Sequence, residues 1–562
     1  MLGLSLYCGK IIWKIGCYVL FTFLLLWNYF NLTELNPLII DEEYDYIIVG
    51  TGVGGSVVAS GIQSNNVLIL EAGTRVPSLL YIPMAAPLLF RSPYDWNFYT
   101  TPQKHGAKAF KNRQIPVFQG KTFGGSHMLN NMMYVRGHPD DYRSYIDGEY
   151  NFQRDIEEFF RRFESQLEPE ELKYRTKLSD VFREAGQESG YGNFTIPFVT
   201  QKHGMRFTTA NYYEELNRKG HRVIFGSLVT QVIFQEGTTV ASGVKFVKND
   251  KEYLVRARKG VILSAGTVGS AKILLQSGIG PRDHLEEMGI PLKLNLPVGD
   301  NLQDHVTTGY NILLLNESLP VGLSSFLSPK TLFSFLREDT GPLTMPGCES
   351  TAFLPSGSSD IPSLQFMILP AGLTSDLGSH LRKVVNLDDA SWEKYFGRML
   401  EKSSATVLPI VLHPKSRGTV RLRDSNPTTP PLIDPKLLSH PDDKEIIFRG
   451  IRILQQLTET DAMKRLGAEI NTLPFPGCES HPWDSRDYWM CYIEHLTLSV
   501  FHPAGTCSMG SVVGKDFRVF HTEKLYIVDA SVIPELPSGN PMATVGMLAH
   551  RFLDSHHKVQ NL

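Results

Sequence analysis

A glycine-rich turn near the amino terminus constrains this chain more than any other feature. Residues 44–55 read YDYIIVGTGVGG, an apolar run that enters a turn at Gly50, Gly52 and Gly55, and a second apolar run ends just before Glu71. In a strand, turn and helix of this kind, backbone N–H groups and a helix amino terminus face a pyrophosphate, and an acidic residue about twenty positions on binds ribose hydroxyls. The pattern predicts a dinucleotide site, and by itself it allows a nicotinamide cofactor as well as a flavin.

The composition is that of a large globular enzyme. The chain has 562 residues, of which 42% are hydrophobic and 20% are charged, an ordinary mixture for a protein with a sizeable core. The net charge is only −3, and no long run of one sign occurs, so we expect no nucleic-acid partner.

A separate apolar segment precedes the glycine-rich turn. Residues 15–30 read IGCYVLFTFLLLWNYF, without a charge, and Lys10 and Lys14 come before them. As a helix this run would span about 24 Å, longer than a typical signal-peptide core and short for a membrane span. Because no small-residue cleavage site follows, we favour a signal anchor within residues 1–40 over a cleaved signal peptide. Either of these two interpretations places the body in the secretory pathway, in a lumen or outside the cell; the remaining alternative for the run is a buried core helix.

The cysteines fit that compartment. Cys478 and Cys491 bracket the polar segment GCESHPWDSRDYWMC and could pair in an oxidising environment; the alternative is two unrelated thiols. The sequence contains no CxxC spacing, so we expect no metal site. Three glycosylation sequons, at Asn31, Asn193 and Asn316, are compatible with secretion.

Several later segments are also expected to form strands and helices like those around the glycine-rich turn. Residues 81–120 show little periodicity and suggest long loops. The elements that we expect are a strand at 260–265, helices at 271–276 and 442–457, a strand at 525–528 and a helix at 543–553. The nucleotide-binding fold is therefore expected to be assembled from pieces that are far apart in the sequence.

Two long motifs carry a resemblance to a known family. Residues 120–142, GKTFGGSHMLNNMMYVRGHPDDY, resemble the first signature of the glucose-methanol-choline oxidoreductases, and residues 264–280 resemble the second signature of that family. The stretches PVGDNLQDH at 297–305 and HPKSRGTVRL at 413–422 extend the similarity. The pattern is most similar to the insect glucose dehydrogenase-like branch. Ala271 stands where the family usually has Pro, a change that we expect a helix start to tolerate.

The resemblance implies a fold and a domain division. It implies an α/β protein with a Rossmann-like FAD-binding domain, built from discontinuous segments, and an α+β substrate domain. The expected FAD-binding segments are 41–160, 220–305 and 510–562, and the expected substrate-binding segments are 161–219 and 306–509.

The resemblance also implies which residues contact FAD. Gly124 and Gly125 would let the backbone approach the flavin, and Asn130 would contact its ring system. The remaining implied contacts are Trp96, Val229 beside the adenine, Ala265 in the second signature, and Asp529 with Ala530 near the pyrophosphate and ring; Trp96 and Val229 could equally be core residues. Some members attach FAD through a His just before the Asn, but Leu129 stands at that place and His127 lies two residues earlier. We therefore expect FAD to be held without a covalent bond.

The chemistry is expected near the carboxyl end. In the family, the position of His502 faces flavin N5 and the position of Asn540 lies beside it. An imidazole near its ordinary pKa of about 6.5 can accept a hydroxyl proton near neutral pH, and an amide can orient the substrate oxygen. We therefore expect His502 to be the general base and Asn540 an orienting donor. We expect residues 497–502 and nearby loops to line the substrate side.

These expectations define an FAD-dependent oxidoreductase that oxidises the CH–OH group of a small-molecule alcohol by hydride transfer to flavin N5. The branch leaves open a sugar, a sterol, an aryl alcohol or a hydroxylated retinoid as substrate, and oxygen or a quinone-like compound as electron acceptor. Oxidation that forms a retinoid chromophore is one specific alternative, and a catalytically silent FAD-binding protein is another. The sequence contains no GxSxG nucleophile elbow of a hydrolase.

Overall fold

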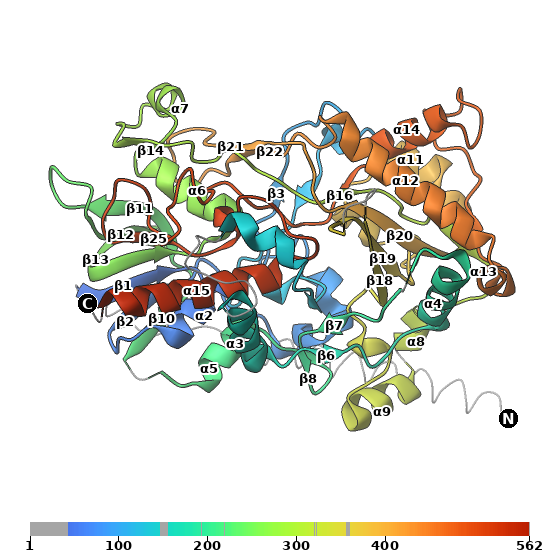
Figure 1. Cartoon of the computed structure of the whole chain (residues 1–562), viewed down its shortest axis with the longest axis horizontal. Coiled ribbons are helices and arrows are strands. Elements are labelled where there is room, and N and C mark those ends of the chain that lie inside the picture. Colours follow the sequence, from blue (N-terminus) through green and yellow to red (C-terminus); the bar gives the residue numbers. More distant parts are fainter. Residues whose placement is uncertain are drawn as a thin grey trace.

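The protein is an elongated body with a β-sheet toward each end (Figure 1). The computed structural model describes residues 43–145, 155–192, 194–218, 220–319, 321, 323–326, 328–355 and 360–560. The predicted anchor at 15–30 and the sequons at Asn31 and Asn193 lie outside these residues. In the described part of the chain, no helix combines the length and the apolar character that a membrane crossing requires.

The first sheet is the predicted nucleotide-binding sheet. Its seven strands include an order β10-β2-β1-β13-β12-β11, with β25 also paired to β13. The parallel strands are β1 (Glu43–Val49), β2 (Val67–Leu70), β10 (His221–Ile224), β13 (Lys251–Leu263) and β25 (Leu525–Ile527), and β11 (Leu228–Phe234) and β12 (Ala241–Lys248) extend the sheet antiparallel. Strands from residue 43 to residue 527 thus share one sheet, which confirms a Rossmann-like fold assembled from discontinuous segments.

The central strands are fully buried, as continuous apolar runs in parallel sheets are. Helices pack beside the sheet: α2 (Val53–Gly61) contacts β1 and packs against α15 (Met542–Gln560), and α15 packs against α3 (Glu157–Leu167). The predicted strand at 260–265 corresponds only to the end of β13, which stops at Leu263, because residues 251–256 first pair with β12.

The helix predicted at 271–276 begins earlier than expected. In the structure α6 spans Gly266–Gln276. Its first N–H group, that of Gly266, donates to Asp529 Oδ2 at 2.9 Å, and this carboxylate from a distant segment replaces a local N-cap signal. Ala271 therefore lies inside the helix and is buried, rather than at its start.

The second sheet forms the core of the other end of the molecule. It is an antiparallel sheet of seven strands, in which β17 (Leu313–Leu315) pairs with β20 and with β23 (Glu469–Ile470), and five strands follow the order β18-β19-β20-β16-β24. These strands are β18 (Ser350–Pro355), β19 (Pro362–Leu369), β20 (Ser403–Val411), β16 (Val306–Thr307) and β24 (Leu498–Ser499). Helix α12 (Pro441–Thr458) packs on β20 and also contacts α14 (Arg486–His495) and α4 (Lys177–Ser189). All five strands come from the segments predicted for the substrate domain.

Cys478 and Cys491 form a disulfide, as one of the two sequence interpretations predicted. The bond joins the segment before α14 to the helix itself, and His495 Nδ1 lies 3.5 Å from both sulfur atoms. These three residues are the only potential metal-ligating cluster found among the described residues. Because both cysteines are already bonded to each other, they do not offer thiolate ligands.

Candidate active site

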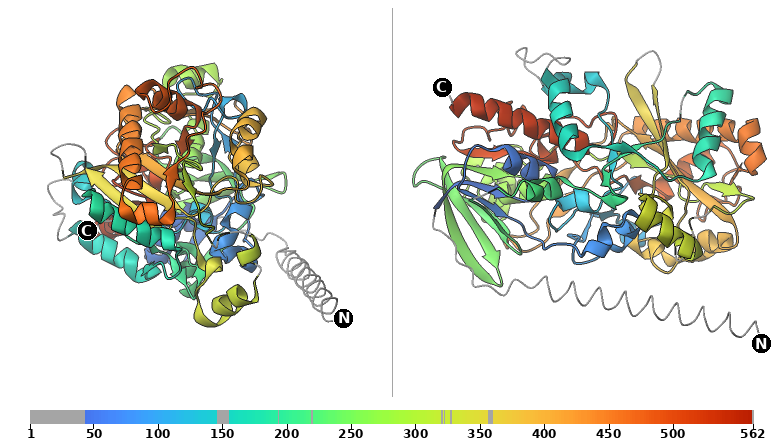
Figure 2. Two further views of the ribbon diagram at one scale, coloured as in Figure 1. Left: turned by 90° about the vertical axis from the view of Figure 1, so that its right-hand side faces the viewer. Right: turned by 90° about the horizontal axis from the view of Figure 1, so that it is seen from below.

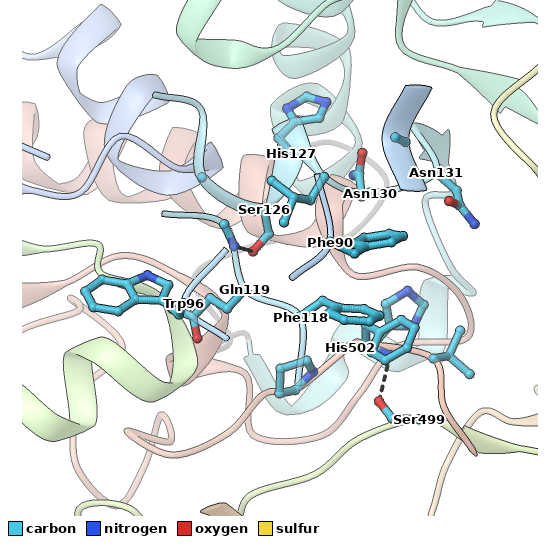
Figure 3. Close-up of a pocket in the computed structure, with 18 of the residues that line it drawn as sticks. Phe90, Trp96, Phe118, Gln119, Ser126, His127, Asn130, Asn131, Ser499 and His502 are labelled. Carbon is cyan, nitrogen blue, oxygen red and sulfur yellow. Dashed lines mark hydrogen bonds between the residues drawn. The ribbon is translucent and has the colours of Figure 1, made fainter. Parts of the chain in front are cut away.

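A cavity of about 830 Å³ runs between the two sheets. At one end it is lined by the turn after β1, and at the other by the loop that follows β24. Figure 3 shows side chains that line it, with Phe90, Phe118 and His502 gathered together and Trp96, Gln119 and Ser126 further along. The cavity therefore connects the predicted pyrophosphate site to the predicted catalytic residues.

The glycine-rich turn lies against the backbone of neighbouring segments. Gly50 has a φ of +99°, and a Cβ atom there would overlap the carbonyl oxygen of Ser264. A Cβ on Gly54 would overlap the carbonyl oxygen of Val528. Gly52 differs, because a Cβ there would meet no atom within 4 Å, and it lines the cavity just before α2. The turn thus leaves an open cradle of backbone at a helix amino terminus, which fits a pyrophosphate.

Glu71 closes this end of the cavity. Its Oε2 accepts hydrogen bonds from Thr51 N at 3.0 Å and Thr51 Oγ1 at 2.6 Å, and its Oε1 accepts one from Gly73 N at 2.8 Å. Burial raises the pKa of Glu71, although these donors oppose the shift. A carboxylate has about four acceptor positions, so the three bonds fix Glu71 and leave room for a ribose hydroxyl.

The first signature forms the middle of the cavity wall. Gly125 lies against the glycine-rich turn, since a Cβ there would come within 2.9 Å of Gly52 Cα. Asn130 lines the cavity; its Oδ1 accepts from Met132 N at 3.0 Å and from Arg206 Nη1 at 2.8 Å, and its Nδ2 lies 3.6 Å from Met542 Sδ. Arg206, which no sequence motif indicated, is 2% exposed, and burial lowers its pKa to about 9.

Most of the sequence-predicted cofactor residues line this one cavity. Gly55 and Gly124 are the two that are not in its wall. Gly55 packs against the carbonyl oxygen of Gly50, so its role is to bring helix and strand together. The predicted residues in the wall are Gly50, Gly52, Glu71, Trp96, Gly125, Asn130, Val229, Ala265, Asp529, Ala530, His502 and Asn540.

His502 is held from three directions. Its backbone N–H donates to Asp304 Oδ1 at 2.9 Å. Its ring Nδ1 lies 2.8 Å from His305 Nδ1, and its ring Nε2 lies 3.0 Å from Asn540 Nδ2. The two sequence-predicted catalytic residues are therefore in direct contact, and the structure adds His305 and Asp304 to them.

The hydrogen bonds define where the protons lie. His305 Nε2 is 2.9 Å from the carbonyl oxygen of Leu412, which can only accept, so this nitrogen carries the proton and the neutral ring has its lone pair at Nδ1. The Nδ1 of His502 must then donate to it. As a result, His502 Nε2 carries a lone pair, and it can accept from the Asn540 amide or from a substrate hydroxyl.

The pKa of His502 differs from our expectation of an ordinary value. The ring contacts the cavity, but the surrounding walls shield it from bulk solvent, and this burial lowers its pKa to about 3. Burial and the neighbouring His502 also hold the pKa of His305 well below its usual range. Both imidazoles are therefore neutral at pH 7, which is the state that the hydrogen-bond chain requires.

The wall around His502 is apolar and aromatic. Phe90 stacks on Phe118 with ring centroids 4.3 Å apart, and Phe118 packs on Phe501 at 4.4 Å. Met367, Leu373 and Leu408 also line the cavity. Residues 498–502 line it as predicted, whereas Thr497 is buried outside the wall.

Several polar side chains on this wall form hydrogen bonds within the protein. Thr307 Oγ1 donates to the carbonyl oxygen of Pro409 at 2.8 Å, and His380 Nε2 to that of Pro87 at 3.0 Å. The Ser499 hydroxyl donates to Asp304. His502 and Asn540 place hydrogen-bonding groups on this wall, and the side chains of Asn131 and Tyr310 also line the cavity.

A Rossmann-like sheet, a pyrophosphate cradle and a cavity that ends at a neutral histidine define a dinucleotide-dependent oxidoreductase. Comparison with known proteins identifies its family. Two sequence profiles described as GMC oxidoreductase match residues 44–307 and 414–549. The chain belongs to the GMC, or glucose-methanol-choline, oxidoreductase family, and it is an FAD-dependent oxidoreductase acting on alcohols.

Relatives and a solved structure agree with this assignment. The chain is 33% identical to an alcohol dehydrogenase [acceptor] of Pseudomonas putida, over 90% of this chain and 94% of that protein. It is 29% identical to glucose dehydrogenase [FAD, quinone] of Drosophila melanogaster, over 91% and 86% of the two chains. The crystal structure of pyridoxine 4-oxidase from Mesorbium loti is similar with a TM-score of 0.74 and 25% identity, over 92% and 99% of the two chains.

Proposed function

We propose that this protein oxidises the CH–OH group of an apolar alcohol, with His502 as general base and Asn540 as the donor that orients the substrate oxygen. The observation that carries the proposal is the chain from Leu412 through His305 and His502 to Asn540, because it leaves the lone pair of His502 Nε2 at the cavity. When bound, FAD supplies the hydride acceptor.

The protein's own residues provide the proton path. The substrate hydroxyl would replace part of the contact between Asn540 and His502, accepting from the Asn540 amide and donating to His502 Nε2. As the alcohol carbon loses a hydride and becomes a carbonyl carbon, the hydroxyl proton moves to His502 Nε2. The imidazolium then keeps its Nδ1–H bond to His305, which stabilises the new charge. Release of this proton restores the neutral pair.

The residues that would hold FAD are those of the cavity wall. Gly50 and Gly52 would face the pyrophosphate, Glu71 the adenosine ribose, and Asn130 the ring system. His127 supports a non-covalent attachment, because its Nε2 is 3.0 Å from Thr200 Oγ1 and its Nδ1 accepts from Thr209 N at 3.4 Å. Acid precipitation should release all of the flavin into the supernatant; flavin that stays with the protein contradicts this part of the proposal.

The apolar wall supports an apolar substrate over a sugar. A sugar would bring several hydroxyls against Phe90, Phe118 and Phe501, and each buried hydroxyl without a partner costs about 1–3 kcal/mol. A lipophilic alcohol needs polar partners only at its reacting hydroxyl, and His502 and Asn540 provide them. Aryl alcohols, sterols and hydroxylated retinoids all meet this description.

A substrate panel tests the proposal directly. The holoenzyme is mixed anaerobically with benzyl alcohol, a hydroxylated retinoid, 20-hydroxyecdysone or glucose, and flavin reduction is followed near 450 nm. We expect at least one apolar alcohol to reduce the flavin with a second-order rate constant about 100-fold above that of glucose. Faster reduction by glucose would overturn the substrate class, and no reduction by any alcohol would favour a silent FAD-binding protein. Reoxidation in air and with a soluble quinone then identifies the acceptor.

The sequence and the disulfide support a location in the secretory pathway. Disulfides persist in oxidising compartments, and the apolar run at 15–30 has the composition of a signal anchor. We propose that residues 15–30 hold the enzyme to a membrane with its body in the lumen or outside the cell. Protection of the body from protease in sealed microsomes would support this orientation, and digestion without detergent would contradict it.

A further inference from the structure

One surface helix presents its apolar side to solvent. In α9 (Pro329–Glu338) the side chains of Leu332, Phe333 and Leu336 are 41%, 58% and 71% exposed, whereas Thr331 is only 5% exposed. A helix on a globular protein normally buries its apolar stripe, so α9 is reversed. Exposed apolar patches of this kind mark surfaces that bind another apolar phase.

The helix is well formed and projects from the body. Its N-cap residue, Ser328, accepts a hydrogen bond from Thr331 N at 3.1 Å, and Pro329 occupies the first turn. Figure 1 and Figure 2 show α9 protruding from the body of the protein. Within the part of the chain that the structure describes, Phe333 and Leu336 each keep more than half of their surface exposed.

The reversed helix is linked by contacts to a segment of the cavity wall. It contacts the short 3-10 helix η7 (Pro342–Thr344), and η7 contacts η2 (Pro83–Leu88), which lines the cavity. Leu88, at the end of η2, is 54% exposed. Leu88 is thus both exposed and part of the cavity wall, and contacts through η7 link it to α9.

The charges on α9 point to an apolar contact rather than an electrostatic one. Lys330, Arg337 and Glu338 are exposed, so the helix has no concentration of positive charge that would require anionic lipid. An amphipathic helix can lie in the plane of a bilayer interface with its apolar face among the acyl chains.

We propose that the α9 face, defined by Leu332, Phe333 and Leu336, docks together with Leu88 on a lipid bilayer. The occupant follows from the rest of the chain. The apolar run at 15–30 ends twelve residues before β1 begins at Glu43, and twelve residues reach at most about 43 Å. With that run in a bilayer, the body stays within reach of the same bilayer, so docking is intramolecular. A soluble protein has no such tether, and a second copy of the chain is not covalently joined to this body.

Docking would give the cavity direct access to lipid-dissolved molecules. An apolar alcohol could then pass from the acyl chains over Leu88 to the cavity without entering bulk water. This consequence for substrate supply rests on the proposed function, whereas the docking itself does not.

Photo-crosslinking in a membrane tests the docking. The full-length holoenzyme is placed in phosphatidylcholine liposomes that contain a small fraction of phosphatidylcholine with a diazirine in its acyl chain. After irradiation, peptides that carry lipid are identified by mass spectrometry. We expect lipid adducts on residues 329–338, and we expect about a tenfold decrease there in a Leu332→Ser, Phe333→Ser, Leu336→Ser variant.

A matched pair of substitutions separates docking from a general loss of apolar surface. Leu336→Ser should reduce the adducts on α9, whereas Leu254→Ser, at a 49% exposed leucine of β13, should leave them unchanged. Both side chains are exposed, so both variants should retain the flavin absorbance of the wild type. Adducts confined to residues 1–42, or an equal effect of both substitutions, would overturn the proposal. Protein-to-protein crosslinks through α9 would also overturn it, in favour of self-association.

Failure of the two proposals can be told apart. If no alcohol reduces the flavin but lipid adducts form on α9, the docking stands and the proposed oxidation fails. If flavin reduction occurs but α9 carries no lipid, the docking fails alone. For an active enzyme, the triple variant should raise the apparent KM about tenfold for a lipid-dissolved alcohol and leave that for a short water-soluble alcohol unchanged.

Discussion

The two ends of the cavity depend on opposite properties of their residues. At the glycine-rich turn the important property is the absence of side chains, because Gly50 and Gly54 touch the backbone of Ser264 and Val528. At the other end the important property is the identity of side chains, because His502 and Asn540 present particular nitrogen atoms. The comparison indicates that changes at the first end should affect cofactor binding, and changes at the second should affect turnover with the cofactor still bound.

The largest expected effect is at the chemical end. In His502→Ala the substrate proton has no acceptor, so kcat should fall about 10²- to 10⁴-fold, while the flavin absorbance per protein is unchanged. Rapid-mixing measurement of flavin reduction under anaerobic conditions provides the rate. Loss of flavin in this variant would contradict the assignment of turnover to one end of the cavity and cofactor binding to the other.

The next effect, at the glycine end, should have the opposite signature. Gly52→Ala adds a methyl group where the protein itself leaves open space, so the flavin-free protein should keep its stability while FAD binds about 10- to 100-fold more weakly. Fluorescence titration with FAD measures the affinity, and urea unfolding measures the stability. As a contrast, Gly54→Ala should destabilise the flavin-free protein itself by about 1–3 kcal/mol, because its methyl group overlaps the backbone of Val528.

His305 sharpens the comparison, because it acts only through another residue. In His305→Ala the Nδ1 of His502 loses its acceptor and the ring is no longer held as one tautomer. We expect kcat to fall about 10- to 100-fold with little change in KM or flavin content. The pH profile of kcat/KM should also change shape. A variant whose pH profile matches the wild type would show that His305 has only a structural role.

The smallest effect is the response of the wild type to mild acid. Burial lowers the pKa of His502 to about 3, so its Nε2 lone pair stays available, and kcat/KM should change less than about twofold between pH 7 and pH 5. An ordinary histidine would lose more than about tenfold over this range. The free energy of unfolding, in contrast, should fall with pH. Below about pH 6.5 the unfolded chain binds a proton at His502 that the folded chain does not bind, so the contribution of His502 to stability is lost as pH falls toward 3. The loss should be smaller in His502→Gln.

Local patterns predicted the strands and the glycine-rich turn well. The apolar runs at 44–49 and 67–70 are strands because they are buried on both faces of a parallel sheet, a situation that the sequence itself signals. The start of α6 at Gly266 was missed because its stabilising partner, Asp529, lies 263 residues away. No local window contains that carboxylate.

The candidate site shows the same limit. His502 and Asn540 were identified through a resemblance to a family, and the structure brings their side chains within 3.0 Å. His305 belonged to a recognised motif, PVGDNLQDH, but nothing in that motif specified that its Nδ1 faces His502. Arg206 had no motif at all, and only its buried contact with Asn130 shows its importance. A hydrogen bond depends on angles and distances between segments that meet only in the folded chain.

The sequence by itself therefore determined the central strands and the glycine-rich turn, because these follow from local periodicity and from short-range backbone requirements. The family and FAD followed from the resemblance of longer motifs to known signatures. The tertiary structure decided the tautomer of His502, the apolar wall around it and the outward face of α9. Each of these arises where distant segments meet or fail to meet: His305 and His502 are 197 positions apart, and no packed element covers Leu336 among the described residues. Burial and contact are properties of the folded chain as a whole, so they emerge only with it.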